Sequence, residues 1–294
     1  MNPTKRKILL IGRSGSGKTS MRSISWEFNF KFMDCGGQDS YLENFFGSQR
    51  DRVFRNVEVL IYVFDVTRKD TEKDLNYLES SVFALSEFSP ESKIFCLIHK
   101  VDLIPEEERE NVIESYKEEI MKFLSKFSEI LENPLKVTCF GTSIWNETLF
   151  LAWSKIVYSL IPKIQLLEEH LHSFCQICDA EEVVLFERST FLVISASSSK
   201  TYQDIHRFEK ISKFIKHFKL SCNKAHSPFQ SMEIRNRFFT AFVDSFTANS
   251  YILVIISDPQ IENAAISLNI QVARNHFENL VQKTRGNDDN ALVI

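Results

Sequence analysis

Apolar and polar positions divide the chain into short strands and longer amphipathic helices. In the first half, apolar runs typical of buried strands occur at Lys7–Ile11, Val57–Asp65, Lys93–His99 and Leu135–Phe140. Residues 26–34 alternate between apolar and polar side chains, which predicts a strand with one face in water. Helical spacing predicts helices over residues 71–88, 105–127 and 145–160. Strands that alternate with helices predict a doubly wound, mostly parallel α/β sheet with its ligand at the carboxyl ends of the strands.

The pattern changes at about residue 162, where strands begin to follow one another directly along the chain. We predict strands at 182–188, 190–196, 229–235, 238–247 and 251–256, and helices at 162–179, 202–220 and 259–283. This α-β-β-α-β-β-β-α order predicts a small α+β unit that suits dimerisation. We therefore expect a first domain over residues 1–162, a second over 163–286 and a polar tail over 287–294.

Composition narrows the function classes. The 294 residues suit two domains, and a net charge of −4 gives no indication of nucleic-acid binding. No apolar run is long enough to span a bilayer, and the N-terminus lacks the apolar region of a signal peptide, so we expect membrane residence only through a partner. The six cysteines are expected to be reduced thiols. Cys175 and Cys178 form a C-x-x-C without a second pair at zinc spacing, so we expect two packed thiols.

A glycine-rich segment follows the first predicted strand. Residues 12–19 read Gly-Arg-Ser-Gly-Ser-Gly-Lys-Thr, which is a complete phosphate-loop pattern between a strand and a helix. The glycines allow backbone N–H groups to turn toward phosphate oxygens, Lys18 would reach the β- and γ-phosphates, and the Thr19 hydroxyl would bind Mg²⁺. We expect the phosphates to be bound by Arg13, Ser14, Gly15, Ser16, Gly17, Lys18, Thr19 and Ser20.

A D-x-x-G pattern, Asp34-Cys-Gly-Gly37, ends the strand predicted over residues 26–34. Asp34 alone could be a turn residue, but downstream of a complete phosphate loop it is expected to hold Mg²⁺ through water. The Gly37 amide would meet the γ-phosphate. Gln38 follows it and would orient the attacking water, which makes it the candidate catalytic residue.

A third motif, His99-Lys100-Val101-Asp102, follows the next buried strand and resembles the guanine-binding N/T-K-x-D motif. The Asp102 carboxylate can accept two hydrogen bonds from guanine, a donor pattern that adenine lacks, so Asp102 argues against an adenine-nucleotide kinase or ATPase. Lys100 would lie along the base, and His99 stands where Asn is commoner. A backbone amide of Ser143 or Ile144 would meet the guanine O6. Asp65 could be a further metal ligand, but its place at a strand end favours a turn.

These motifs together resemble the Rag GTPases of the A/B type, and the resemblance covers nearly the whole chain. It rests on residues 12–20, 34–38, 49–57, 62–66, 99–102, 142–145, 185–188, 206–211 and 229–232. The resemblance implies GTP/GDP and Mg²⁺ as cofactors, and a roadblock-like C-terminal domain that pairs with a C/D-type Rag subunit. It also implies a cytoplasmic protein that relays amino-acid availability to the TOR complex, recruited to the lysosomal surface by a scaffold that supplies the anchor.

One segment departs from the family pattern. Only fourteen residues separate Thr19 from Asp34, too few for a helix, switch I and two strands. The strand that ends at Asp34 is therefore predicted at a sheet edge. We expect guanine contacts to survive, whereas Mg²⁺ and γ-phosphate sensing should weaken. Two hypotheses follow: a GTP-binding switch with slow hydrolysis, or a nucleotide-binding scaffold that no longer switches and acts only through dimerisation.

Overall fold

The protein is described here by a computed structural model that divides into two compact units, residues Met1–Ala152 and Trp153–Ile294. The structure describes residues 7–24, 31–34, 49–68, 70–126, 136–161, 164–188, 190–199, 207–258 and 260–288. The two units meet within helix α6 (Thr148–Ser159), about ten residues before the domain boundary expected from the sequence.

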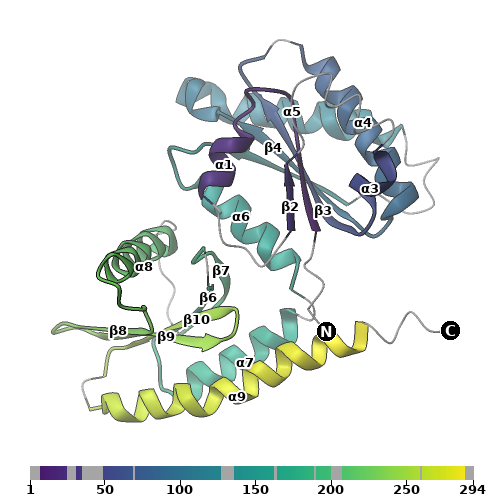
Figure 1. The fold of residues 1–294 in the computed structure, drawn as a ribbon. Helices are drawn as coiled ribbons and strands as arrows, with labels where there is room; N and C mark the ends of the chain where they lie inside the picture. Colours follow the sequence, from purple (N-terminus) through teal and green to yellow (C-terminus); the bar gives the residue numbers. More distant parts are fainter. Residues whose placement is uncertain are drawn as a thin grey trace. The chain divides into compact units, whose positions relative to one another are not determined.

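The first unit is a parallel α/β sheet (Figure 1). Its five strands have the order β2-β1-β3-β4-β5. In chain order its elements are β1 (Lys7–Ile11), α1 (Lys18–Ile24), β2 (Lys31–Asp34), α3 (Arg50–Phe54), β3 (Val57–Asp65), α4 (Thr71–Phe88), β4 (Lys93–His99), the 3₁₀ turn η1 (Val101–Leu103), α5 (Glu106–Ser125) and β5 (Val137–Thr142). This arrangement confirms the predicted doubly wound fold class.

Helices cover both faces of this sheet. Side chains from α3, α4 and α5 pack on one face, against alternate residues of the central strands such as Leu9, Leu60 and Tyr62. Helix α1 lies on the opposite face (Figure 1). Because β3 lies between two other strands and under helices, eight of its nine residues are buried, which explains why it reads as a nearly continuous apolar run.

Strand β2 ends the sheet. It pairs in parallel with β1, from Lys7 opposite Lys31 to Leu10 opposite Asp34, and no described strand lies beyond it. The predicted edge position is therefore confirmed for residues 31–34. The earlier part of that predicted strand, residues 26–30, falls outside the described residues.

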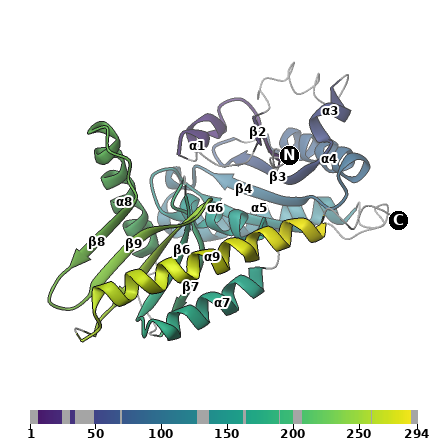
Figure 2. The same cartoon turned by 60° about the horizontal axis from the view of Figure 1, so that its bottom comes forward.

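The second unit is an antiparallel sheet between helices. Its elements are α7 (Ile164–Ile177), β6 (Glu182–Glu187), β7 (Val193–Ser198), α8 (Arg207–Lys224), β8 (Ser231–Arg235), β9 (Thr240–Thr247), β10 (Ser250–Ile256) and α9 (Asn263–Asp288). The strand order is β7-β6-β10-β9-β8. Helices α7 and α9 run side by side over one face, and α8 covers the other (Figures 1 and 2). The predicted element order is confirmed.

The cysteines of the C-x-x-C pattern lie inside this unit. Cys175 and Cys178 are both buried in the core between the sheet and helices α7 and α9. In the part of the chain that the structure describes, no group of three or more His, Cys, Asp or Glu side chains could hold a metal ion. The burial of both thiols in this core confirms the prediction that they are packed. Among the described helices, none has the length and apolarity needed to cross a membrane.

Candidate nucleotide-binding site

The phosphate loop connects β1 to α1 and requires glycine at two positions. Gly12 has a φ of +156° and Gly17 a φ of +97°, in a range that other residues rarely adopt. A Cβ on Gly12 would lie 2.6 Å from the Val63 carbonyl oxygen, and one on Gly17 would lie 2.6 Å from Cδ2 of His99. The backbone of the loop therefore lies against β3 and β4 near their carboxyl ends. Only glycine, which lacks a Cβ, permits so close an approach at these two positions.

Two side chains in the loop fit a bound phosphate. Lys18 is buried, and its Nζ donates to the carbonyl oxygens of Gly12 at 2.6 Å and Arg13 at 2.9 Å, so the ammonium group is held at the loop. The Ser16 side chain is buried, and its hydroxyl has no hydrogen-bond partner within the described residues. Because buried hydroxyls are normally paired, this orphaned group matches a site for an oxygen-rich ligand.

The predicted Mg²⁺ ligands lie at the same end of the sheet. Thr19 is exposed in the first turn of α1, next to Ser20, which is also exposed. Asp34 ends β2 opposite Leu10, one residue before β1 ends, so both strands deliver their last residues to one edge. Thr19 carries a hydroxyl oxygen and Asp34 carries carboxylate oxygens, and oxygen atoms are the ligands that Mg²⁺ prefers. Gly37 and the candidate catalytic residue Gln38 lie outside the described residues.

The Arg13 side chain points to helix α4. Its Nη1 lies 3.3 Å from the Asp70 carbonyl oxygen, 3.5 Å from Asp70 Oδ2 and 3.6 Å from Asp74 Oδ2. Burial raises the pKa of Asp74, although hydrogen bonding from Tyr62 at 3.1 Å and the Arg13 charge oppose that shift. The Arg13 guanidinium therefore balances the charge of the buried Asp74 carboxylate. The group that Arg13 still offers to a bound phosphate is its backbone N–H.

His99 joins three parts of the site. It ends β4 with 2% of its surface exposed, its Nδ1 lies 3.0 Å from Thr142 Oγ1 on β5, and its ring packs on Gly17 of the phosphate loop. Burial lowers the pKa of His99 to about 4, so the ring is neutral at pH 7. A neutral imidazole can pair with a hydroxyl and pack on a glycine, which explains how His takes the place of the commoner Asn.

Lys100 and Asp65 form an ion pair between the ends of β4 and β3. Lys100 has a φ of +67°, and its Nζ lies 2.6 Å from Asp65 Oδ2. The other carboxylate oxygen accepts from the N–H of Thr67 at 3.1 Å and from its hydroxyl at 2.7 Å. Burial alone would raise the pKa of Asp65, but these bonds from Lys100 and Thr67 outweigh it, and the pKa is lowered. Asp65 thus closes a turn, which agrees with the turn role that its position at a strand end predicted.

The residues predicted to contact guanine follow β4 and β5. Asp102 lies half-buried on η1, and its backbone oxygen accepts from Arg109 of α5 at 3.5 Å. Its carboxylate forms no hydrogen bond to any residue that the structure describes. The Ser143 N–H donates to Thr148 Oγ1 at 2.9 Å. The N–H of Ile144 makes no hydrogen bond within the described residues, so Ile144 is the better candidate for the guanine O6 contact.

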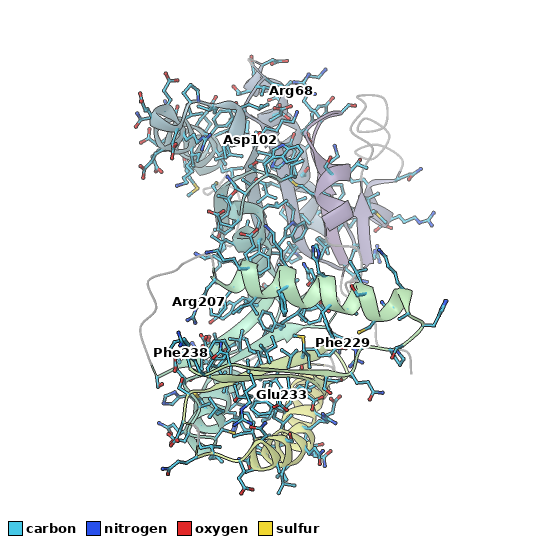
Figure 3. The ribbon with its side chains drawn as sticks, turned by 90° about the vertical axis from the view of Figure 1, so that its left-hand side faces the viewer. Arg68, Asp102, Arg207, Phe229, Glu233 and Phe238 are labelled. Carbon is cyan, nitrogen blue, oxygen red and sulfur yellow. The ribbon has the colours of Figure 1, made fainter. Side chains whose placement is uncertain are left out.

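Two residues of this region were missed by the sequence reasoning. Arg68, in the turn after β3 (Figure 3), donates through Nη2 to the Ser14 carbonyl oxygen, and its Nε lies 3.6 Å from Asp65 Oδ2. Trp145 follows the Ser143-Ile144 segment and is 81% exposed. An indole at that position is a ready stacking surface for a base. The sequence alone could have indicated Trp145, because it directly follows the segment predicted to bind the guanine O6.

Comparison with known proteins shows the family of this chain. Residues 25–215 match the model of the Gtr1/RagA G protein conserved region, and the match covers more than half of the chain. The chain belongs to the Gtr1/RagA family. The Ras-related GTP-binding protein A of Dictyostelium discoideum is 50% identical over 95% of this chain and 99% of its own length. The Ras-related GTP-binding protein B of Rattus norvegicus is 46% identical over 94% of this chain and 86% of its own.

More distant matches complete the comparison. The Ras-related GTP-binding protein C of Homo sapiens is 25% identical over 67% of this chain and 54% of its own length. A Roadblock/LC7 domain from Streptomyces avermitilis covers 37% of this Gtr1/RagA-family chain and 96% of its own at 11% identity, with a TM-score of 0.31.

The alignments also bear on the short first segment. The alignment with the Dictyostelium protein runs over 306 residues, which exceeds the 294 residues of this chain. The relative therefore contains residues that have no counterpart here. The interval between Thr19 and Asp34, shorter than the family pattern requires, is the position that the sequence predicts for this gap.

Proposed function

We propose that this chain is a guanine-nucleotide-binding regulatory subunit with slow GTP hydrolysis. The observation that carries the proposal is the contact of His99 with both Gly17 and Thr142. Through these contacts, the guanine-reading segments after β4 and β5 lie against the phosphate loop. One ligand with a base at one end and phosphates at the other fits this arrangement.

Each part of the site has a role in the proposal. Lys18 and the loop amides bind the phosphates, and Thr19 and Asp34 would hold Mg²⁺, which supplies charge neutralisation between the phosphates. Asp102 reads the guanine edge, and Trp145 offers an aromatic face to the base. Gln38 would orient the attacking water, and without a switch I residue to complete the Mg²⁺ site we expect hydrolysis to be slow.

Calorimetric titration of the purified chain with GTP, GDP and ATP, with and without Mg²⁺, tests the proposal. We expect guanine-selective binding, tighter for GTP only when Mg²⁺ is present, and loss of both in a Lys18→Met control. Equal binding of ATP would refute the base assignment, and absence of any binding by the folded chain would refute nucleotide binding altogether.

A second candidate is a scaffold subunit that binds nucleotide but does not switch. The edge position of β2 and the fourteen residues between Thr19 and Asp34 favour it, because they leave no room for switch I. The same titration separates the two candidates. Guanine binding that is indifferent to Mg²⁺ and to the γ-phosphate would make the scaffold the better description.

We also infer that the second unit pairs with a C/D-type Rag subunit. Helix α8 exposes large apolar side chains, with Phe214 at 55% and Leu220 at 58%. Beside it in the chain, β8 is the last strand of its sheet, and Phe238 after β8 is 66% exposed (Figure 3). An edge strand and an apolar helix surface together favour association by strand pairing.

Co-expression with a C-type relative tests this pairing. We expect size-exclusion chromatography with light scattering to show a complex that contains one copy of each chain. This complex should be lost in a Phe214→Asp, Leu220→Asp double variant. Leu268→Asp on α9, where Leu268 is 59% exposed, is the matched control and should leave the complex intact. Loss of the complex in the control alone would place the interface on α9.

For the cellular role, we propose that the heterodimer relays amino-acid availability to the TOR complex at the lysosomal surface. Membership of the Gtr1/RagA family supports this role, and a partner scaffold would supply the membrane anchor. The test is the location of the tagged chain relative to a lysosomal marker, together with TOR kinase output, in starved and refed cells. A chain that stays diffuse, and whose deletion leaves TOR output unchanged, would contradict the proposal.

A further inference from the structure

Two cysteines face each other across neighbouring strands beneath the nucleotide site. Cys96 of β4 and Cys139 of β5 are register partners in the parallel pairing. Both side chains lie on the face that α4 and α5 cover, where Cys96 is fully buried and Cys139, half-buried, packs against the same core. Each thiol is the largest influence on the pKa of the other. The pair is thus positioned as a dithiol with one member that solvent can reach.

We propose that Cys96 and Cys139 are a redox modification site, at which a hydroperoxide forms an intramolecular disulfide that weakens guanine-nucleotide binding. The effect on binding rests on the proposed function. The formation of the bond does not, because it depends only on the two strands and their thiols.

The surroundings assign different roles to the two thiols. The neighbouring Cys96 thiol and the charge of Lys117 lower the pKa of Cys139, although burial and Glu114 oppose the shift. The neighbouring Cys139 thiol and complete burial raise the pKa of Cys96. The thiolate is the nucleophile in thiol oxidation, so Cys139 is the residue that reacts first and Cys96 the residue that resolves it.

The reaction balances with a hydroperoxide as the only oxidant. The Cys139 thiolate attacks the outer peroxide oxygen, the O–O bond breaks, and the leaving alkoxide or hydroxide takes a proton from water. Cys139 is then a sulfenic acid. The Cys96 sulfur attacks it, the S–S bond forms, and the sulfenic oxygen leaves as water with the proton from Cys96. Two thiols are oxidised by two electrons and one peroxide is reduced.

The disulfide would change the spacing of the two strands that read guanine. Neighbouring strands lie about 4.8 Å apart, whereas the Cα atoms of two residues joined by a disulfide most often lie about 5.5–6 Å apart. The bond therefore pushes β4 and β5 apart by about 1 Å at this point. His99 and Thr142 each lie three residues further along these strands and are themselves a bonded pair at 3.0 Å. We expect about a tenfold loss of GDP affinity, because a small displacement would weaken the two hydrogen bonds proposed between the Asp102 carboxylate and guanine.

The other close pair of cysteines serves as an internal comparison. Cys175 and Cys178 are both buried, and burial raises the pKa of Cys178 to about 11 and also raises that of Cys175. Neither therefore supplies a thiolate near neutral pH. We expect this pair to stay reduced under conditions that oxidise Cys139.

Non-reducing peptide mapping of the full chain after stepwise hydrogen peroxide tests the bond itself. We expect a cross-linked Cys96–Cys139 peptide that dithiothreitol releases, and mapping separates it from products of Cys35, which lies outside the described residues. Cys139→Ser should abolish the cross-link, Cys96→Ala should leave a sulfenic acid on Cys139 that dimedone traps, and Cys222→Ser is the matched control. Oxidation of Cys139 to sulfinic acid in the unaltered chain, without a cross-link, would overturn the proposal.

The release rate of a fluorescent GDP, before oxidation and after, tests the consequence. We expect faster release from the oxidised chain, reversal by dithiothreitol, and no change in Cys139→Ser. Unchanged release from a fully cross-linked chain would overturn the coupling to the site. If the chain bound no GDP at all, the proposed function would fail while the mapping result would still decide whether the disulfide forms.

Discussion

Asp102 is the residue that we propose to determine base selectivity. Its carboxylate has no partner in the described residues, and η1 is held by Arg109, so the group is free to accept from guanine. We expect Asp102→Asn to move preference from guanine to xanthine, because the amide can donate to the additional carbonyl. Competition of GTP and XTP for the chain measures this change. Asp102→Ala should lose both bases, and unchanged GTP affinity in the Asn variant would contradict the assignment.

Arg68 ties the phosphate loop to the turn after β3. Its bond to the Ser14 carbonyl oxygen is on the surface, where such contacts contribute little to folding. We therefore expect Arg68→Ala to change the free energy of unfolding by less than about 0.5 kcal/mol but to speed GDP release several-fold, since the loop loses a restraint. Stopped-flow release of a fluorescent GDP measures the effect. Arg55→Ala removes an exposed pair with Asp51 and should leave release unchanged.

His99 makes stability depend on pH. The pKa of His99 is lowered from 6.5 to about 4 by burial, so between these values the unfolded chain binds a proton that the folded chain does not. Stability contributed by the neutral ring is present above pH 6.5 and is lost as pH falls toward 4, by on the order of 3 kcal/mol in total. Urea unfolding from pH 7 to 4.5 measures the slope. His99→Asn should flatten it, and an equal slope in that variant would exclude His99 as the cause.

At the residue scale, the positions of the candidate residues at the strand ends were easier to predict than the directions of their side chains. The phosphate loop, Asp102 and Ile144 were predictable because each motif lies directly after a strand, and parallel strands end at one edge. The direction of Arg13 was not, because it depends on the buried charge of Asp74, sixty-one residues away in the chain. Arg68 was missed for the same reason, since no motif marks its contact with the loop.

Helix α5 is held close to β5 by a glycine. A Cβ on Gly141 would lie 2.3 Å from Cδ1 and 2.8 Å from Cγ1 of Ile113. We expect Gly141→Ala to destabilise the first unit by about 1–3 kcal/mol, because the added methyl group overpacks this contact. Thermal or urea unfolding measures the change. Ile113→Ala in the same chain should restore part of the loss, and additive effects of the two substitutions would contradict the contact.

Element boundaries shifted where side chains bind the backbone locally. The strand predicted at 190–196 begins at Val193, because Glu187 Oε2 accepts from both the N–H and the hydroxyl of Thr190 and closes a turn. The helix predicted from residue 259 begins at Asn263, because Asp258 Oδ1 accepts from the Gln260 N–H. The apolar pattern predicted the elements themselves, whereas such turns depend on single polar side chains.

Over the whole molecule, nucleotide should stabilise one unit and leave the other unchanged. All the residues proposed to bind it belong to the first unit, and binding to the folded form alone adds about 2.7 kcal/mol at a hundred times Kd. We expect GDP to slow amide hydrogen exchange in β1, β3 and β4. Exchange in β6, β9 and β10 should not change. Hydrogen exchange followed by mass spectrometry, with peptides from both sheets, measures the two effects. Equal protection of both sheets would contradict independent units.

The exposure of Trp145 gives the chain an optical property. Of its three tryptophans, Trp153 is 2% exposed and Trp145 is 81% exposed, whereas Trp26 falls outside the described residues. A buried indole emits at shorter wavelength and is shielded from iodide, while an indole in water emits to the red and is quenched. A Trp26→Phe chain would therefore report through a single accessible fluorophore next to the proposed base site, and its spectrum would follow loading and release of unlabelled nucleotide in real time.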